Sequence, residues 1–521
     1  MRDRFIGADL GTSGIKAGVT DVGGRVLASL YWETELTSSG PGRMAQSPED
    51  FFAQTLRIIR AVMEKAGISG NEVQGIALDG QMGGVIGVDR SFVPLTGLDM
   101  GLDIRSEKYN ALVHQQHGKL LRSLSCGSPR NTPKIMWWQG EQGPTYRKVV
   151  KFVTLGGFVA GRLAGLRGED AFLDYTSLAF FGNEDARRRA WSDELSTAFG
   201  LDLEKFPRIV EPWEIVGTLT AAAARESGLL EGTPVAAGAG DQPAGLLGGG
   251  FLRPGALCDV SGSSTLLFQC VDYYRPDTAF GAVAYIPSIL EDRYHALSYI
   301  NGGGIALSWL RDGILKGSAF TSYEKLTRGA AALPAGADGL LFVPYFGGRQ
   351  CPYDADFRGG WLGLNWGHRP EHLFRSMIEG LTYDCAVGLK NLRKLFPEYR
   401  PQELDSYGGG SRNGLWSQIK ADVLGLPVRC LESHDFAITG CALVAARALG
   451  AITEFDASRR ADAADCPVYR PDPATAEKYA GYLEAFEACC SGSGIALSAV
   501  FRCLSALAGG SSRATEALES R

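Results

Sequence analysis

Residues 6–16 read I-G-A-D-L-G-T-S-G-I-K, and residues 257–267 read L-C-D-V-S-G-S-S-T-L-L. The two stretches superpose when position 262 is laid on position 11, an offset of 251 residues. In both, an apolar strand breaks into a glycine and two hydroxyl side chains, which suits an anion because glycine lets backbone N–H groups come close to it. The superposed positions are Gly11 with Gly262, Thr12 with Ser263 and Ser13 with Ser264. The repeat predicts two related lobes that face one anionic ligand.

The two copies differ at one chemically important position. Asp9 of the first copy falls opposite Val260 of the second. Two phosphate-binding turns with a single carboxylate make an asymmetric site. That asymmetry is what an enzyme of phosphoryl transfer needs.

Length, composition and charge narrow the class of protein. A single hydrophobic core stops growing at about 250–300 residues, so a chain of 521 residues favours two large domains. The formal net charge of −6 argues against a nucleic-acid partner, for which a basic face is expected. Eleven cysteines without a C-x-x-C spacing indicate reduced thiols. Since we find no signal peptide and no membrane-spanning apolar run, we expect a cytoplasmic protein without a membrane partner.

Hydrophobic spacing and turn residues predict a mixed α/β chain. The expected strands are 4–10, 15–20, 26–31, 73–78, 256–260, 266–271 and 404–407, and the expected helices are 48–66, 370–390, 415–424 and 437–448. We place the hinge between the halves near 248–254, where glycines and a proline interrupt the pattern. The expected units are a first lobe over 1–250, a second lobe over 251–490 and a tail over 491–521 that forms a frayed helix.

Asp9-Leu10-Gly11-Thr12-Ser13 lies where the first strand meets its turn. Consecutive N–H groups and two hydroxyls can wrap a phosphate, and Asp9 at the strand end can hold Mg²⁺ directly or through water. An ordinary glycine–serine hairpin explains the same residues equally well. The motif alone leaves both interpretations open.

A second carboxylate follows the short strand 234–237, in the sequence Gly238-Ala239-Gly240-Asp241-Gln242. At a strand end among small residues, Asp241 can accept the proton of a substrate hydroxyl while phosphate is transferred. Asp241 can also cap the helix that begins near Gln242, and from these residues alone the cap is favoured. One side chain can serve both roles.

Two further glycine runs precede helices. Tyr407-Gly408-Gly409-Gly410-Ser411-Arg412-Asn413 leads into a helix with Trp416, and Asn301-Gly302-Gly303-Gly304 leads into one with Trp309. Bare glycine backbone leaves room for a flat ring, and a helix N-terminus favours negative charge. Each run can also be a plain turn.

In chain order the motifs are D-L-G-T-S (9–13), G-A-G-D-Q (238–242), G-S-S-T (262–265), N-G-G-G (301–304), G-L-L-F-V-P-Y-F (339–346), G-G-G-S-R-N (408–413) with W-S-Q-I-K-A-D (416–422), and T-G-C-A-L-V-A-A (439–446). Together they resemble the FGGY family of carbohydrate kinases, and within it the xylulokinase-like branch. The resemblance spans about residues 5–485, and six or more motifs in family order are far more specific than one. It implies an actin-like α/β fold, with two lobes of the ribonuclease-H type and a catalytic cleft between them. The sugar is expected against the first lobe and ATP against the second.

The resemblance also assigns roles to the matching positions. Asp9 matches the magnesium-linked carboxylate and Asp241 the catalytic base, which favours the base over the cap, and we expect both at the Mg²⁺. The expected ATP-binding residues are Gly11, Thr12, Ser13, Lys16, Gly262, Ser263, Gly303, Gly409, Gly410, Ser411 and Asn413. The expected substrate-binding residues are Gln81, Met82, Asp103, Arg105, Asp241 and Gln242.

Two positions depart from the xylulokinase pattern. Residues 80–84 read G-Q-M-G-G, with Gly83 where a sugar-binding His is expected, and Gly101 replaces a Trp within 98–105. Asp103 and Arg105 are retained. The loss of an imidazole and an indole predicts a larger and differently polarised sugar pocket, while the phosphoryl-transfer residues are untouched.

We therefore expect an ATP- and Mg²⁺-dependent kinase of a pentulose, with xylulose as the first candidate. A kinase of another ketose or polyol, of the ribulose, erythritol or glycerol type, stays open. So does a sugar and nucleotide sensor without turnover, although intact Asp9 and Asp241 argue against it. The sequence does not fix the acceptor, the hydroxyl that is phosphorylated or the oligomeric state, for which a homodimer is one option in this family.

Overall fold

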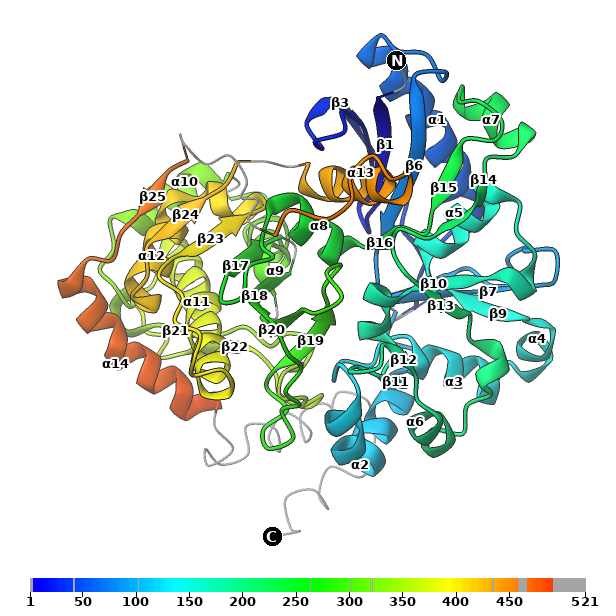
Figure 1. The fold of residues 1–521 in the computed structure, drawn as a ribbon. Coiled ribbons are helices and arrows are strands. Elements are labelled where there is room, and N and C mark those ends of the chain that lie inside the picture. Colours follow the sequence, from blue (N-terminus) through cyan, green and yellow to red (C-terminus); the bar gives the residue numbers. More distant parts are fainter. Residues whose placement is uncertain are drawn as a thin grey trace.

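The structure, a computed structural model, describes residues 3–40, 43–101, 103–262, 264–300, 302–318, 320, 322–432, 435–457 and 466–490. These residues form two lobes, each built around a seven-stranded sheet with helices packed against it (Figure 1). Ser263, Asn301 and the tail 491–521, all named in the sequence analysis, lie outside the described residues.

The first sheet is a hairpin extended on one side by parallel strands. β1 and β2 are antiparallel, as the glycine-rich turn between them predicts, and β6 is parallel to β1. In order across the sheet the strands are β14 (Ile215–Thr218), β15 (Pro234–Ala236), β6 (Val73–Gly80), β1 (Arg4–Leu10), β2 (Gly14–Thr20) and β3 (Val26–Glu33), with β16 (Ala239–Gly240) also paired to β6. The strands β1, β6 and β16 consequently end side by side.

The second sheet repeats this core. β17 and β18 form the antiparallel hairpin, and β23 is parallel to β17. In order the strands are β19 (Ala284–Pro287), β20 (Tyr294–Ile300), β18 (Thr265–Val271), β17 (Leu257–Ser261), β23 (Leu404–Tyr407), β24 (Val428–Cys430) and β25 (Val468–Tyr469). The two repeated sequence stretches therefore start equivalent sheets.

The remaining elements cover these sheets and extend the first lobe. A five-stranded sheet runs in the order β4 (Thr37–Gly40), β5 (Arg43–Gln46), β8 (Leu98–Met100), β7 (Gly84–Val88) and β9 (Lys151–Val153). Short strand pairs are β10 (Phe172–Asp174) with β13 (Arg208–Val210), β11 (Glu184–Asp185) with β12 (Ala190–Trp191), and β21 (Leu341–Val343) with β22 (Gly360–Leu362). The α-helices are α1 (Pro48–Ala66), α2 (Glu107–Leu124), α3 (Thr132–Glu141), α4 (Gly143–Lys148), α5 (Leu155–Ala164), α6 (Asp193–Ala198), α7 (Ala221–Ser227), α8 (Asp241–Gly249), α9 (Gly303–Ser308), α10 (Tyr323–Ala331), α11 (Pro370–Leu395), α12 (Gly414–Leu424), α13 (Phe436–Ala448) and α14 (Pro473–Cys490).

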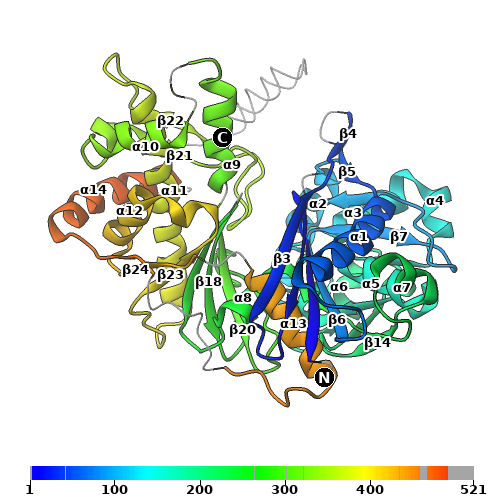
Figure 2. The same cartoon turned by 90° about the horizontal axis from the view of Figure 1, so that it is seen from above.

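The two faces of β1 meet different helices, because side chains alternate along a strand. Ile6 and Leu10 share a core with α1. Gly7 faces α13, which comes late in the chain yet lies against β1 and β6 (orange in Figures 1 and 2). A Cβ at Gly7 would lie only 2.4 Å from the carbonyl oxygen of Ile438. Helix α13 thus closes the face of the first sheet on which Asp9 also lies.

Helices α8 and α13 cross in close contact between the lobes (Figure 2). A Cβ at Gly248 would lie 1.9 Å from the carbonyl oxygen of Phe436, and one at Gly440 would lie 1.9 Å from that of Ala244. Side chains are excluded at both glycines. Since α8 follows a strand of the first sheet and α13 follows strands of the second, the pair joins the lobes.

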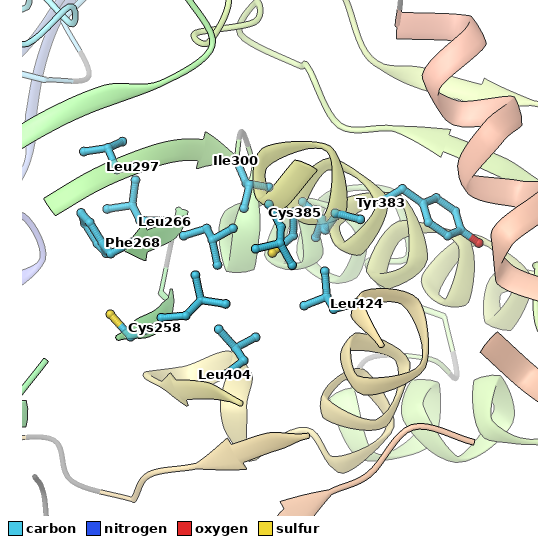
Figure 3. Close-up of a cluster of buried hydrophobic side chains, with 14 of the residues drawn as sticks. Cys258, Leu266, Phe268, Leu297, Ile300, Tyr383, Cys385, Leu404 and Leu424 are labelled. Atoms are coloured by element: carbon cyan, nitrogen blue, oxygen red, sulfur yellow. The ribbon is translucent and has the colours of Figure 1, made fainter. Parts of the chain in front are cut away.

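The core of the second lobe lies between its sheet and helices α11 and α12. Figure 3 shows the strand residues Leu266, Phe268, Leu297 and Ile300 together with Tyr383, Cys385 and Leu424 from the helices. Burial of such side chains stabilises a lobe by about 1.5–3 kcal/mol each.

Most expected elements are present, and their ends differ by a few residues. The strands 4–10 and 404–407 agree with β1 and β23, whereas α11 continues to Leu395 instead of ending at 390. Ser47 caps α1 by accepting from Asp50 N at 3.2 Å, and Gly67 ends it with a φ of 67°.

None of the helices within the described ranges has both the length and the apolarity that a membrane span needs.

Candidate active site

Three carboxylates lie where β1, β6 and β16 end side by side. Asp9 of β1 is the direct partner of Asp79 of β6 in the parallel register, and Ala239 of β16 pairs with Asp79 on its other side. Asp241 follows β16 immediately and is the first residue of α8. The carboxyl ends of parallel strands form one edge, which is where α/β sheets bind ligands.

Burial and mutual repulsion disfavour ionisation of these acids. Burial, and next the charge of Asp9, raise the pKa of Asp241 to about 7. Burial also raises the pKa of Asp9, although Asp79 and Lys16 oppose that shift. Burial and the neighbouring Asp9 raise the pKa of Asp79 well above its usual range. A carboxyl group with a pKa near 7 can accept a proton at neutral pH, as a general base must.

Asp241 does not occupy the cap position that its sequence context suggested. The N-cap of α8 is Gly240, and Asp241 is the first helical residue. Its Oδ1 accepts from the backbone N–H of Gln242 at 2.8 Å. The position at the N-terminal end of the helix favours the ionised carboxylate, against the effect of burial. Gln242, expected at the substrate, contacts Asp241 through its backbone.

Asp79 is a site residue that the sequence analysis did not single out. Its side chain is fully buried, and its Oδ2 accepts from the Cys441 thiol of α13 at 3.0 Å. Its Oδ1 has no hydrogen-bond partner among the described residues. A buried acid without full pairing costs stability, and such groups cluster at functional sites. The available signal was a second apolar strand ending in Asp, I-A-L-D-G, but only the register shows that it adjoins Asp9.

The first glycine–hydroxyl turn is tied to the neighbouring sheet. Gly11, Thr12 and Ser13 connect β1 to β2. Thr12 Oγ1 donates to Gln81 Oε1 at 3.4 Å, and the backbone oxygen of Thr12 accepts from Gln46 Nε2 at 2.9 Å. These bonds fix the turn beside the residues expected to bind sugar.

Lys16 lies on β2 beside the acidic edge. Its ammonium group pairs with Asp435 Oδ1 at 3.3 Å, and Asp435 immediately precedes α13. The charge of Lys16 also lowers the pKa of Asp9. This expected ATP-binding residue therefore contacts the helix that joins the lobes.

A cavity of about 1060 Å³ opens in the second lobe at the second glycine–hydroxyl turn. Its volume is large enough for a nucleotide-sized ligand. Of the expected ATP-binding residues, Gly262, Gly409, Gly410 and Asn413 line this cavity. Asn413 also caps α12 by accepting from Trp416 N at 3.2 Å, so the helix N-terminus points at the cavity.

Two expected residues, Gly303 and Ser411, adjoin the cavity without lining it. Gly303 begins α9 next to Gly304, which does line the cavity. Ser411 is buried, and its hydroxyl donates to Gly408 O at 2.8 Å. Gly408 needs its positive φ of 100°, and a Cβ there would lie 2.7 Å from Ser261 O.

The equivalent strand of the second lobe carries a neutralised acid. Asp259 of β17 is fully buried and forms an ion pair with Lys420 of α12. Its Oδ2 also accepts from Ser261 Oγ at 2.9 Å and from Ser406 Oγ at 3.0 Å. Val260, the position equivalent to Asp9, is uncharged. The second lobe thus lacks an acid at the position that Asp9 occupies in the first.

Gln81 and Met82 follow β6 and link the acidic edge to the smaller sheet. Gln81 Nε2 donates to Gln46 Oε1 at 3.0 Å. The Met82 thioether packs against Gly240, where a Cβ would lie 2.6 Å from its sulfur. The backbone oxygen of Met82 accepts from Asn131 Nδ2 at 2.9 Å. These expected substrate residues therefore abut the segment that carries Asp241.

Arg105 holds two buried carboxylates in place. Its Nε donates to both oxygens of Asp103 at 2.9 Å, and its Nη2 donates to Asp99 Oδ1 at 2.5 Å. Trp138 Nε1 donates to the other oxygen of Asp99, whose pKa burial raises to about 6. The guanidinium lies 4.8 Å from the centre of the Trp137 ring. Asp99 and the two tryptophans complete a rigid polar wall around the expected Asp103 and Arg105.

The two departures from the family pattern face each other. Gly83 and Gly101 flank the register pair of Gly84 with Met100. A Cβ at Gly101 would lie 3.2 Å from Gly83 O, and a Cβ at Gly83 would lie 3.6 Å from Gly101 Cα. The two glycine backbones therefore lie close to each other, and among the described residues the only atoms within 4 Å of either Cβ position, chain neighbours aside, are backbone atoms of the other glycine.

The acidic edge fits a magnesium ion that is bound mainly by other ligands. Mg²⁺ commonly takes one or two carboxylates and completes its shell with water and phosphate oxygens. Asp9 and Asp241 would supply the carboxylates here, and Asp79 Oδ1 is buried without a partner in the described residues. Within the described ranges, no group of three or more His, Cys, Asp or Glu side chains is placed so that it could hold a metal ion, so water and phosphate oxygens would have to supply most of the ligands.

Comparison with known proteins identifies the family. The N-terminal domain model of the FGGY family of carbohydrate kinases matches residues 4–248, and the C-terminal domain model matches residues 260–449. A xylulose kinase of Staphylococcus epidermidis is 27% identical over 490 residues, which cover 94% of this chain and 96% of that protein.

Solved structures share the fold. A gluconate kinase from Lactobacillus acidophilus superposes with a TM-score of 0.83 at 22% identity, over 95% of this chain and 99% of that one. A ligand-bound xylulose kinase from the same organism gives 0.82 at 22% identity, over 93% and 96%. The two α/β lobes with mixed sheets are those of the actin-like fold. The chain belongs to the FGGY family of carbohydrate kinases, enzymes that transfer a phosphoryl group from ATP to a sugar.

Proposed function

We propose that this kinase phosphorylates a pentulose, with xylulose as the first candidate and Asp241 as the general base. The observation that carries the proposal is the position of Asp241 at the shared end of β1, β6 and β16, with its pKa raised to about 7. A base with that pKa is ionised in part at neutral pH and still binds a proton well. The acceptor hydroxyl loses its proton to Asp241 as the phosphoryl group reaches it.

The glycine–hydroxyl turns are proposed to hold the phosphates. Gly11, Thr12 and Ser13 act from the first lobe, and Gly262 and Ser263 from the second. A magnesium ion held by Asp9 and Asp241 would neutralise charge on the β- and γ-phosphates. Since the transition state of phosphoryl transfer is loose, positioning and electrostatics supply most of the acceleration.

The nucleoside is proposed to occupy the cavity of the second lobe. Gly409 and Gly410 offer bare backbone to a flat base, and Leu307 and Phe374 give the cavity apolar walls. Lys16, Gly303, Ser411 and Asn413 complete the proposed ATP-binding set. Gln81, Met82, Asp103, Arg105 and Gln242 form the proposed sugar side with Asp241.

Gly83 and Gly101, which leave this part of the proposed sugar side without an imidazole or an indole, support a second candidate, a kinase of a larger or more polar acceptor. The similarity in fold to a gluconate kinase as well as to xylulose kinases agrees with either candidate.

An ADP-release assay with Mg-ATP tests the proposal on purified protein. The acceptor panel is D-xylulose, L-xylulose, D-ribulose, L-ribulose, L-fuculose, erythritol, D-arabitol, xylitol, glycerol and D-gluconate. Turnover with D-xylulose is expected, and turnover with another acceptor only would transfer the assignment to that acceptor. Nucleotide binding without any turnover across the panel would contradict the kinase proposal for these acceptors and favour a sensor.

A further inference from the structure

Arg130 carries a positive charge that no acidic side chain in the described part of the chain pairs with. It lies partly exposed on the segment just before α3. Its backbone is anchored, because its N–H donates to Phe180 O at 2.7 Å and its oxygen accepts from Lys134 Nζ at 3.0 Å. The fixed backbone and the lack of an acidic partner among the described residues distinguish Arg130 from an ordinary surface arginine.

The three acids whose charges act on the neighbouring Lys134 already have hydrogen-bonded partners. Asp99 and Asp103 are both held by Arg105. Glu107 accepts from the Tyr353 hydroxyl at 2.5 Å and from Asn110 Nδ2 at 3.2 Å. These carboxylates are therefore engaged elsewhere.

A second cation lies beside Arg130. Lys134 is only 5% exposed. Burial, and next the charge of Arg130, lower the pKa of Lys134 to about 8, although the charges of Asp99, Asp103 and Glu107 oppose that shift. Two neighbouring cations repel each other, so an anion that neutralises them is favoured here.

Arg130 also spans the two lobes. Its guanidinium carbon lies 5.9 Å from the ring centre of Tyr299 on β20. The Tyr299 hydroxyl is 3.0 Å from Ser264 Oγ, in the second glycine–hydroxyl turn. On the other side, the adjacent Asn131 bonds to Met82, which packs against Gly240. Arg130 thus lies between the proposed acceptor side and the proposed phosphate turn.

We propose that Arg130 binds an oxyanion between the lobes, either the phosphoryl group in transfer or an acid group on the acceptor. This inference rests on the proposed function, because both anions belong to the same reaction. A guanidinium presents paired N–H donors that match two oxygens of a phosphoryl or carboxylate group. During transfer, the bond from the γ-phosphorus to the bridging oxygen breaks as the bond to the acceptor oxygen forms. The acceptor proton goes to Asp241, and ADP leaves.

Kinetics of Arg130→Gln with two acceptors separate the two sources. The acceptors are the neutral sugar with the highest turnover and D-gluconate, each assayed with Mg-ATP. If Arg130 contacts the phosphoryl group, kcat falls about 10²-fold with every acceptor that wild type uses, while the KM of the sugar changes little. If it contacts an acid group, kcat/KM falls with D-gluconate alone. Unchanged kinetics with every acceptor that wild type uses would overturn the proposal.

Two further variants exclude a structural cause. Arg187→Gln is the matched control, since the exposed Arg187 also lies over a tyrosine ring, 5.7 Å from that of Tyr274. It should behave as wild type. Arg130→Ala should regain part of its lost activity when guanidinium ion is added at millimolar concentration, and Arg130→Lys should retain more activity than Arg130→Gln. A folded Arg130→Ala that loses activity without any such rescue would contradict direct contact with an oxyanion.

Calorimetric titration with inorganic phosphate tests the oxyanion site without relying on catalytic turnover. If wild type phosphorylates neither acceptor, the proposed function fails for those acceptors, but inorganic phosphate can still be titrated into the ADP-bound protein. Arg130→Gln should bind phosphate about 10-fold more weakly, a loss of about 1.4 kcal/mol, since a hydrogen bond to a charged group is removed. Equal affinity would overturn the oxyanion site.

Discussion

The two lobes present different side chains from equivalent strands. In the first lobe, the register of β1 with β6 sets Asp9 beside Asp79. In the second, the register of β17 with β23 sets Val260 beside Tyr407. The Tyr407 ring stacks against Phe251 with ring centres 5.6 Å apart, so an aromatic side chain stands where the first lobe has Asp79.

The acid of the second lobe is displaced by one residue, which changes its role. Asp259 precedes Val260, and because side chains alternate along a strand the two point to opposite faces. Asp259 consequently meets Lys420 of α12. The comparison teaches that a shift of one position along equivalent strands can move an acid from the shared edge of the sheet into a buried ion pair.

Replacing the proposed base should have the largest effect. Asp241→Asn preserves shape but removes the proton acceptor, so we expect kcat to fall about 10²–10⁴-fold, while the affinity for ATP measured without Mg²⁺ stays unchanged. Steady-state assays and nucleotide titration measure the two quantities. Asp193→Asn, at an exposed position of α6, is the matched control. Near-normal turnover by Asp241→Asn would refute the assignment of the base.

Replacing Lys420, the buried cation that pairs with Asp259 in the second lobe, should lower the free energy of unfolding. Lys420→Met leaves Asp259 buried without its ion pair, which costs about 3–5 kcal/mol. Denaturant unfolding followed by fluorescence measures this loss. The double variant Asp259→Asn with Lys420→Met should regain much of it, and the exposed Lys478→Met should lose little. A single Lys420→Met variant as stable as wild type would show that the pair is not structural.

Low pH should reduce the rate of phosphoryl transfer, because it protonates Asp241 at the acidic edge of the first lobe. Since the pKa of Asp241 is raised to about 7, its carboxylate form is lost as pH falls through 7. We expect kcat/KM to fall about 10-fold per unit below that value, or about 10²-fold by pH 5.

The raised pKa also predicts a change in stability. The folded chain holds the Asp241 proton more tightly than the unfolded chain, so stability declines as pH rises from the ordinary value towards 7. Asp241→Asn should therefore raise Tm at pH 8 and leave it unchanged at pH 4. A value of kcat/KM that stays constant from pH 7 down to pH 5 would contradict the proposed role of Asp241 as the general base.

The smallest of these effects is expected at Asp79. Asp79→Asn keeps the volume beside Asp9 but removes a carboxylate, so the Mg²⁺ concentration needed for half-maximal rate should rise about 10-fold. Titration of the rate with Mg²⁺ measures this shift. Asp89→Asn, on a turn away from the edge, supplies the comparison. If Asp79→Asn shows no change in Mg²⁺ dependence, Asp79 is only a packing residue.

Local pattern predicted much of this molecule. The strand β1, the start and end of α1 and the two glycine–hydroxyl turns follow from spacing and turn chemistry that act over a few residues. Contacts between distant segments were not predictable in this way. Asp79 joins Asp9 only through the register of two strands about 70 residues apart, and Lys420 meets Asp259 across 161 residues.

The close crossing of α8 and α13 decides where this chain can be divided. A fragment that stops at residue 250 leaves the Gly7 face of the first sheet bare, because the helix that covers it lies at residues 436–448. A fragment that starts at 251 carries that helix without the sheet it binds. If the chain is expressed as two separate fragments in the same cell, the fragments should associate through the packing of α13 against the first sheet. A split reporter fused to two fragments that are divided between residues 250 and 251 would measure the affinity of the fragments for each other.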